Sequence, residues 1–116
     1  MVLVDTNIII DYWNSPDERL TEIFEEEDIA ICGIVEAELL HSARSDRELD
    51  EITDAISCFE RLTIGENWNQ LGRMLYRLRI SGVTLPFSDA VIAYIAISNG
   101  ASVLTRDNHF RMIASI

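Results

Sequence analysis

Apolar residues follow two patterns that alternate along the chain. Short continuous apolar runs predict buried strands at residues 2–6, 29–32 and 102–105, with a further short strand at 62–65. Between these runs, apolar residues recur at steps of three and four and predict amphipathic helices. Two long helices are expected from such stripes, Leu49, Ile52, Ile56 and Phe59 in one and Trp68, Leu71, Leu75 and Leu78 in the other.

Capping residues predict where the other helices begin and end. Ser15-Pro16-Asp17-Glu18 predicts a helix start with proline in the first turn, and this helix ends near the acidic cluster 25–28. Ser88 is expected to cap a helix that runs to Ser98 and closes at Asn99-Gly100. Further helices are expected at 7–14, 34–44 and 107–113. Strands separated by helices throughout predict an α/β fold with a mainly parallel sheet, in a single domain spanning 1–116.

The charge of the chain is strongly negative and unevenly distributed. Twenty acidic residues face nine basic ones, all arginine, for a net charge of −11. The absence of lysine excludes P-loop, Schiff-base and kinase chemistry. Residues 1–60 hold 17 acidic residues and 3 arginines, whereas residues 61–116 hold 3 acidic residues and 6 arginines. Although the average charge repels nucleic acid, a surface built from the second half can approach a polyanion.

The remaining composition indicates a cytoplasmic protein. Cys32 and Cys58 lack a metal-ligand spacing and are expected to be buried thiols. No apolar run reaches the ~18 residues of a membrane span, so no membrane association is expected. The N-terminal residues lack the basic region and cleavage site of a signal peptide.

Four acidic residues are expected at one end of the sheet. Asp5 interrupts an apolar run and needs a partner, because an isolated buried carboxylate is costly. Glu38, Asp89 and Asp107 also follow predicted strands or open helices near strand ends, where ligands bind in parallel sheets. Each has a plainer interpretation too, Asp89 and Asp107 as helix caps and Glu38 as a solvated residue. Asp11 is expected to be solvated.

Converging carboxylates require a cation, because like charges raise one another's pKa. Hard divalent cations such as Mg²⁺ take oxygen ligands and keep several waters. Such a site activates water and stabilises the leaving oxygen of a phosphodiester. This chemistry needs no lysine, histidine or cysteine.

Four segments, VLVDTNIIIDYW, AELLHS, SDAVIAYIAISNGA and VLTRDNHF, resemble in order and spacing the motifs of PIN-domain ribonucleases, in particular VapC-type toxins. The resemblance implies a three-layer α/β/α PIN-like fold and a metal-dependent endoribonuclease acting on RNA. It places Asp5, Glu38, Asp89 and Asp107 at a Mg²⁺ or Mn²⁺ centre, supported by Thr6, Asn7 and Thr105. It also implies a homodimer and a VapB-like antitoxin as partner.

Several alternatives stay open at this stage. Glu36 is the rival of Glu38, since residues two apart on a helix point in nearly opposite directions. The arginines of the second half, Arg73, Arg77, Arg79, Arg106 and Arg111, are candidate phosphate contacts or partners of the abundant acids. His109 is expected to be structural or to face the substrate, and His41 to lie at a helix surface. The alternative functions are a PIN-fold binding module without nuclease activity and a phosphatase with an aspartyl nucleophile.

Overall fold

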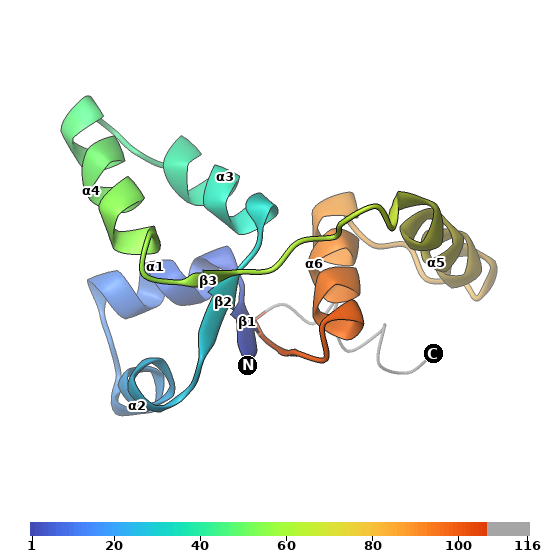
Figure 1. Cartoon of the computed structure of the whole chain (residues 1–116), viewed down its shortest axis with the longest axis horizontal. Helices are drawn as coiled ribbons and strands as arrows, with labels where there is room; N and C mark the ends of the chain where they lie inside the picture. The colour runs from blue at the N-terminus through green and yellow to red at the C-terminus, as the bar shows by residue number, and fades with distance from the viewer. Residues whose placement is uncertain (107–116) are drawn as a thin grey trace.

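The computed structural model describes residues 1–106, which form a four-stranded sheet flanked by helices (Figure 1). The strands are β1 (Val2–Val4), β2 (Ile29–Ile31), β3 (Glu60–Arg61) and β4 (Ser102–Leu104), in the order β3-β2-β1-β4. All three pairings are parallel, with Leu3 opposite Ala30 on one side and Val103 on the other. The predicted parallel sheet is therefore confirmed, and β1 lies at its centre.

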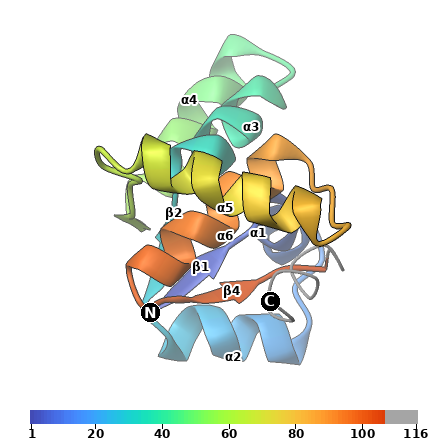
Figure 2. The ribbon, with the colours of Figure 1, turned by 90° about the vertical axis from the view of Figure 1, so that its right-hand side faces the viewer.

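Six helices join the described strands: α1 (Thr6–Asn14), α2 (Glu18–Glu26), α3 (Gly33–His41), α4 (Asp46–Ile56), α5 (Trp68–Ile80) and α6 (Phe87–Ser98). In Figure 1, α1, α2 and α4 lie on one side of the sheet and α6 lies on the other. Figure 2 shows α5 packed outside α6, away from the sheet. The three-layer α/β/α arrangement expected from the sequence is thus present.

The core forms where the short strands meet α1, α3 and α6. Its fully buried residues include Leu3, Ile9, Ile31, Leu39 and Ile92. Strands of three residues are sufficient because both faces of the sheet are covered, which is the usual state of a parallel sheet. None of the helices within residues 1–106 is long and apolar enough to cross a membrane.

The predicted strand at 62–65 is wrong. The third strand is formed by the two exposed residues just before it, Glu60 and Arg61. Their backbone pairs with β2, and the Leu62 N–H continues the ladder with one bond to the Ile31 carbonyl at 2.9 Å. Leu62 and Ile64 are buried in the core without belonging to a strand, which explains their apolar character.

Several predicted helix ends move by a few residues. Asp17 is the N-cap of α2, and its carboxylate accepts from the Leu20 N–H at 2.7 Å, so Pro16 precedes the helix. Helix α6 begins at Phe87 after Pro86, which places Ser88 inside the helix rather than at its cap.

The predicted apolar stripes are only partly buried. Phe59 lies beyond the end of α4, while Leu49 and Trp68 are 38% and 55% exposed. Cys58 is exposed, against expectation, whereas Cys32 is buried; neither forms a disulfide. The helix predicted at 107–113 lies outside the described residues.

Candidate metal centre

Asp5 lies at the carboxyl end of the central strand and is held by both of its carboxylate oxygens. It is the N-cap of α1, and its Oδ1 accepts from the Thr6 N–H at 2.8 Å. Its Oδ2 accepts from the Thr105 hydroxyl at 2.9 Å, and its own N–H donates to the Leu104 carbonyl at 3.1 Å. The half-buried carboxylate is therefore oriented by α1 and by the end of β4, from opposite ends of the chain.

Glu38 and Asp89 approach Asp5 from two further helices. Glu38 lies on α3, which follows β2, and Asp89 lies in the first turn of α6. Partial burial raises the pKa of Glu38, and the negative charges of Asp5 and Asp89 raise it further. Glu38 therefore lies within electrostatic range of Asp5 and Asp89, the other two predicted acids that the structure describes. Asp107 lies outside the described residues.

A buried hydroxyl completes the described part of this site. Thr6 is 8% exposed, and its Oγ1 has no hydrogen-bond partner of ordinary length among residues 1–106. Its proximity to Glu38 nevertheless lowers the pKa of that carboxyl, against the larger effects that raise it. An unsatisfied buried hydroxyl is unfavourable unless water or an ion occupies the adjoining space.

The donor chemistry fits a hard divalent cation. The converging groups present only oxygen atoms, and a cation would relieve the repulsion felt by Glu38. Burial, and to a smaller extent the charge of Asp5, raise the pKa of the nearby Cys32 thiol. Within residues 1–106, no three His, Cys, Asp or Glu side chains enclose an ion by themselves. Mg²⁺ tolerates such a site because it keeps several of its waters.

Two other acids form ion pairs with arginines. Glu36 pairs with Arg61 at 2.6 Å, so it is Glu38 and not Glu36 that faces Asp5. Asp11 was expected to be solvated, but its Oδ2 lies 2.7 Å from the Arg106 Nε. Sequence reasoning missed this ion pair, because its members are 95 positions apart and no local pattern links them.

The remaining candidates lie on α5, at exposed positions of α1 and α3, or outside the described residues. Arg73 and Arg77 lie on α5, where the Arg73 Nε donates to the Asn69 side chain at 2.8 Å. Asn7 is exposed in the first turn of α1, and His41 is exposed at the end of α3. His109 and Arg111 are not among the described residues.

A family model of the PIN domain matches residues 2–116. The chain belongs to the PIN domain family. A search of curated proteins finds no match to this PIN domain.

Solved structures of similar fold cover nearly the whole of this PIN domain. VapBC-1 from nontypeable Haemophilus influenzae aligns with a TM-score of 0.83 and 22% identity, covering 100% of this chain and 95% of that one. A toxin–antitoxin complex from Klebsiella pneumoniae aligns with a TM-score of 0.73 and 24% identity, covering 93% and 88%. The sarcin–ricin loop-cleaving toxin VapC20 from Mycobacterium tuberculosis aligns with a TM-score of 0.69 and 15% identity, covering 96% and 93%. At these identities the likeness shows the fold.

Proposed function

We propose that this PIN domain is a metal-dependent endoribonuclease that hydrolyses RNA phosphodiester bonds with metal-activated water. The observation that carries the proposal is the position of Asp5 at the carboxyl end of the central parallel strand, with Glu38 close enough to feel the charges of Asp5 and Asp89. These residues come from the end of β1 and from helices α3 and α6, and nothing in local capping requires them to lie near one another. Ligands bind at this end of parallel sheets.

In the proposed site, Asp5, Glu38 and Asp89, with Asp107, would hold Mg²⁺ or Mn²⁺. A cation bound there would supply an activated water and would stabilise the departing oxygen of the phosphodiester. Thr6 and Thr105 keep the Asp5 carboxylate in one orientation through the Thr6 N–H and the Thr105 hydroxyl. Glu38 is the most exposed of the three described acids, so its carboxylate is placed to accept the proton of the attacking water. Asn7, exposed beside Asp5, helps to order water.

We also propose that the domain is the toxin of a type II toxin–antitoxin pair and acts in the cytoplasm. One neighbour of similar fold is a toxin–antitoxin complex, and another is a toxin that cleaves the sarcin–ricin loop. By this likeness, the partners are an RNA substrate, a VapB-like antitoxin and a second copy of the chain. The acidic first half of the chain favours an antitoxin segment that is basic.

The decisive experiment is RNA cleavage by the purified protein with Mg²⁺ or Mn²⁺, compared with EDTA and with Asp5→Asn. Asparagine still caps α1, so the fold persists, while the loss of one charge weakens metal binding. Asp17→Asn is the matched control, because Asp17 caps α2 in the same way but lies outside the acid cluster. We expect cleavage that requires metal, disappears in Asp5→Asn and survives in Asp17→Asn.

Two results would contradict this proposal. Cleavage that persists both in EDTA and in Asp5→Asn indicates a contaminant or a different mechanism. Absence of cleavage on several structured RNAs, together with RNA binding that ignores metal, supports the alternative of a PIN-fold binding module.

A further inference from the structure

Helix α5 carries positive charge that the rest of the described chain does not neutralise. Residues 67–88 contain three arginines, Arg73, Arg77 and Arg79, and no acidic residue. Within residues 1–106, four other arginines form ion pairs with carboxylates: Arg44, Arg47, Arg61 and Arg106. None of the three on α5 has a described carboxylate within the 4.0 Å that defines such a pair. The chain has net charge −11, so arginines placed at random would mostly lie near a carboxylate. The three arginines of α5 do not.

The arginines and two large exposed residues occupy the outer side of α5. Leu71 and Leu78 are buried, and α5 packs on α6 through this side. Helical geometry therefore places Arg73, Tyr76 and Ile80 on the opposite side, with Arg77 and Arg79 flanking them. Tyr76 and Ile80 are 54% and 66% exposed. We call this surface, defined by Arg73, Tyr76, Arg77, Arg79 and Ile80, the α5 face.

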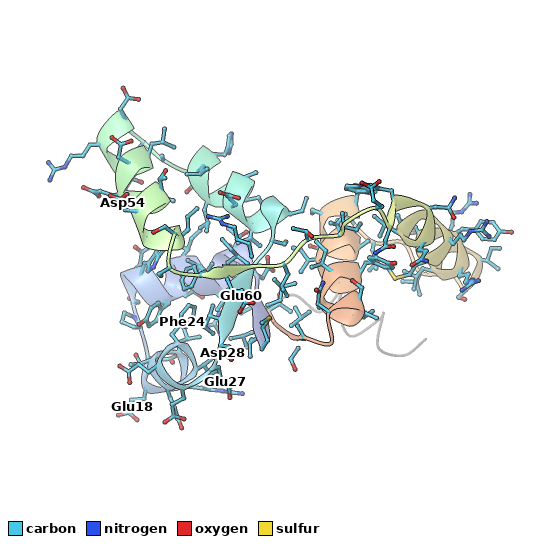
Figure 3. The ribbon with its side chains drawn as sticks, viewed as in Figure 1. Glu18, Phe24, Glu27, Asp28, Asp54 and Glu60 are labelled. Carbon is cyan, nitrogen blue, oxygen red and sulfur yellow. The ribbon has the colours of Figure 1, made fainter. Side chains whose placement is uncertain are left out.

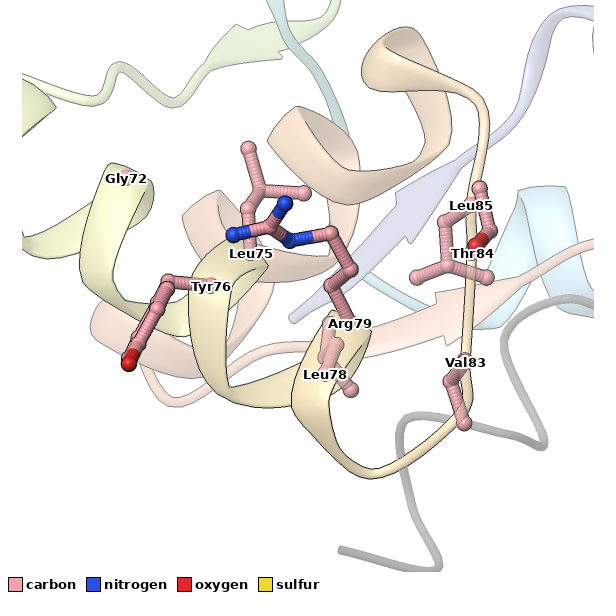
Figure 4. A pocket seen from close by; sticks show the side chains of 8 residues that line it. All are labelled: Gly72, Leu75, Tyr76, Leu78, Arg79, Val83, Thr84 and Leu85. Carbon is pink, nitrogen blue, oxygen red and sulfur yellow. The ribbon is translucent and has the colours of Figure 1, made fainter.

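A pocket of about 360 Å³ connects the α5 face with the segment that leads to the acids. Figure 4 shows Tyr76 and Arg79 on its α5 side and Val83, Thr84 and Leu85 on the other. The Arg79 guanidinium lies 5.7 Å from the centre of the Tyr76 ring, which gives the pocket a cationic and aromatic edge. Its volume lies in the range of small-ligand sites, about 300–1,000 Å³. Beyond Leu85 the chain enters α6, whose first turn carries Asp89.

We infer that the α5 face binds the backbone of single-stranded RNA and that an unpaired base stacks on Tyr76 at this pocket. The inference rests on the proposed ribonuclease function and names the surface by which the substrate is held. Guanidinium groups bind phosphates in a bidentate way, and an exposed aromatic ring stacks on a base of any sequence. From this pocket, the RNA strand runs along residues 83–85 towards Asp89.

A second copy of the chain fits this surface less well than RNA. In a two-fold dimer, the same patch on each subunit meets itself, so the α5 arginines of both copies would face one another. Like charges brought together in this way repel. An RNA strand instead supplies the negative charge that the described residues near α5 do not.

The test measures RNA affinity as a function of salt in the non-cleaving Asp5→Asn background. The probe is a fluorescently labelled, unstructured RNA of about 20 nucleotides, long enough for a binding track of this kind. Each of Arg73→Gln, Arg77→Gln and Arg79→Gln is expected to reduce the slope of log affinity against log salt by about 0.7, and the triple variant by about 2. Tyr76→Leu is expected to weaken single-strand binding about fivefold and to leave duplex binding unchanged.

Arg19→Gln is the matched control. Arg19 lies on α2, also outside the ion pairs described above, but among acidic residues. For Arg19→Gln, the slope of log affinity against log salt should equal that of the Asp5→Asn parent. Equal slopes for all the α5 variants would overturn the inference. So would loss of RNA binding that accompanies a change in oligomeric state by light scattering, because the α5 face would then be a subunit contact.

The failure of this inference can be told apart from the failure of the proposed function. Metal-dependent cleavage by the wild type with unchanged salt slopes in the α5 variants refutes the inference alone. Arginine-dependent binding without any cleavage by the wild type supports the α5 face and refutes the nuclease.

Discussion

Helices α4 and α5 are both amphipathic, but the arginines at α4 form ion pairs with glutamates and those on α5 do not pair with a described carboxylate. At the start of α4, Arg44 and Arg47 each lie four residues before a glutamate and pair with it, at 3.5 Å to Glu48 and 3.2 Å to Glu51. On α5, Arg73 has asparagine four residues before it and another arginine four residues after it. Like charges at this spacing destabilise a helix by a few tenths of a kcal/mol.

The difference lies in the partners of the arginines: those beside α4 pair with carboxylates, whereas those of α5 have no described carboxylate within 4.0 Å. Leu71 and Leu78 anchor α5 on α6. The arginines add a hydrogen bond from Arg73 to Asn69 and a contact of Arg79 with the Tyr76 ring, against the repulsion between neighbouring arginines. Figure 3 shows Glu18, Glu27 and Asp28 around α2, far from α5 across the longest dimension of the molecule. The fold therefore separates an acidic region from a basic one instead of mixing them. A separation maintained against repulsion is what a surface for a charged ligand requires.

The largest effect is expected at Glu38. Glu36 and Glu38 both lie on α3, but their side chains point in different directions. Glu38→Gln should lower RNA cleavage by at least about 100-fold, because it removes a carboxylate that faces Asp5 and Asp89. Glu36→Gln should leave cleavage within about threefold of wild type, since Glu36 pairs with Arg61 instead. Initial rates at saturating Mg²⁺ measure both. Equal losses in the two variants would remove Glu38 from the site.

The next effect concerns Arg106, a paired arginine that lies beside the acids. The Asp11–Arg106 pair fastens the end of β4 to α1, next to the bond between Thr105 and Asp5. Asp11→Asn should therefore lower cleavage or metal affinity about tenfold, as the loss of an outer support does. The salt slope of RNA binding should not change if Arg106 acts through Asp11 alone; a steeper slope would show that the freed Arg106 guanidinium contacts phosphate, as the sequence also allowed.

Exchanging the charges of Asp11 and Arg106 tests whether loss of their ion pair causes the expected loss of cleavage. The double variant Asp11→Arg with Arg106→Asp should recover part of the activity that Asp11→Arg alone loses. A double variant no better than the single one would show that the pair has no positioning role. Arg47→Gln, which breaks an exposed pair on α4, should leave cleavage unchanged.

The sequence predicts the strands and helices of this fold well where apolar patterns are long, and poorly where pairing is carried by the backbone. β3 consists of Glu60 and Arg61, both exposed, so it has no apolar signature, while the apolar Leu62 and Ile64 mark buried positions outside the strand. The order β3-β2-β1-β4 likewise depends on which edges the helices cover, and no local pattern encodes it.

Part of the candidate site could likewise be predicted from the sequence, and part could not. Asp5, Glu38 and Asp89 follow from the rule that strand ends of a parallel sheet share one edge. The Thr105–Asp5 bond and the Asp11–Arg106 pair join residues 100 and 95 positions apart. Tertiary contacts between polar residues far apart in the chain leave no periodic pattern in the sequence. For the same reason, the choice of arginines as phosphate contacts or acid partners could not be made from the sequence.

A smaller effect is expected in the pH dependence of metal-free stability. Because burial, Asp5 and Asp89 raise the pKa of Glu38 in the folded state, folding favours its protonated form. The stabilisation from protonated Glu38 is fully present below the pKa that Glu38 has in the unfolded chain. It is lost as pH rises through the pKa of Glu38 in the folded protein. In EDTA, Glu38→Gln should therefore have a higher Tm than wild type near pH 8 and gain progressively less towards pH 4.

Metal provides the control for this pH effect. Mg²⁺ should raise the Tm of wild type more than that of Glu38→Gln, because a cation that binds the folded state stabilises it. A Tm difference between the two proteins that is independent of both pH and Mg²⁺ would show that Glu38 is an ordinary solvated residue.

The smallest effect comes from giving α5 the pairing that α4 has. Asn69→Glu places a carboxylate four residues before Arg73, where the asparagine side chain now accepts at 2.8 Å. The new pair should stabilise the fold by about 0.3–0.5 kcal/mol, measured by urea denaturation. If the α5 face binds RNA, the same change should weaken binding, because Arg73 is occupied and a negative charge meets the phosphates. Asn69→Gln keeps the hydrogen bond without the charge and should alter neither property. A variant that is stabilised and still binds RNA with the parent's salt slope would place the substrate elsewhere, and the contrast between α4 and α5 would then have no role in RNA recognition.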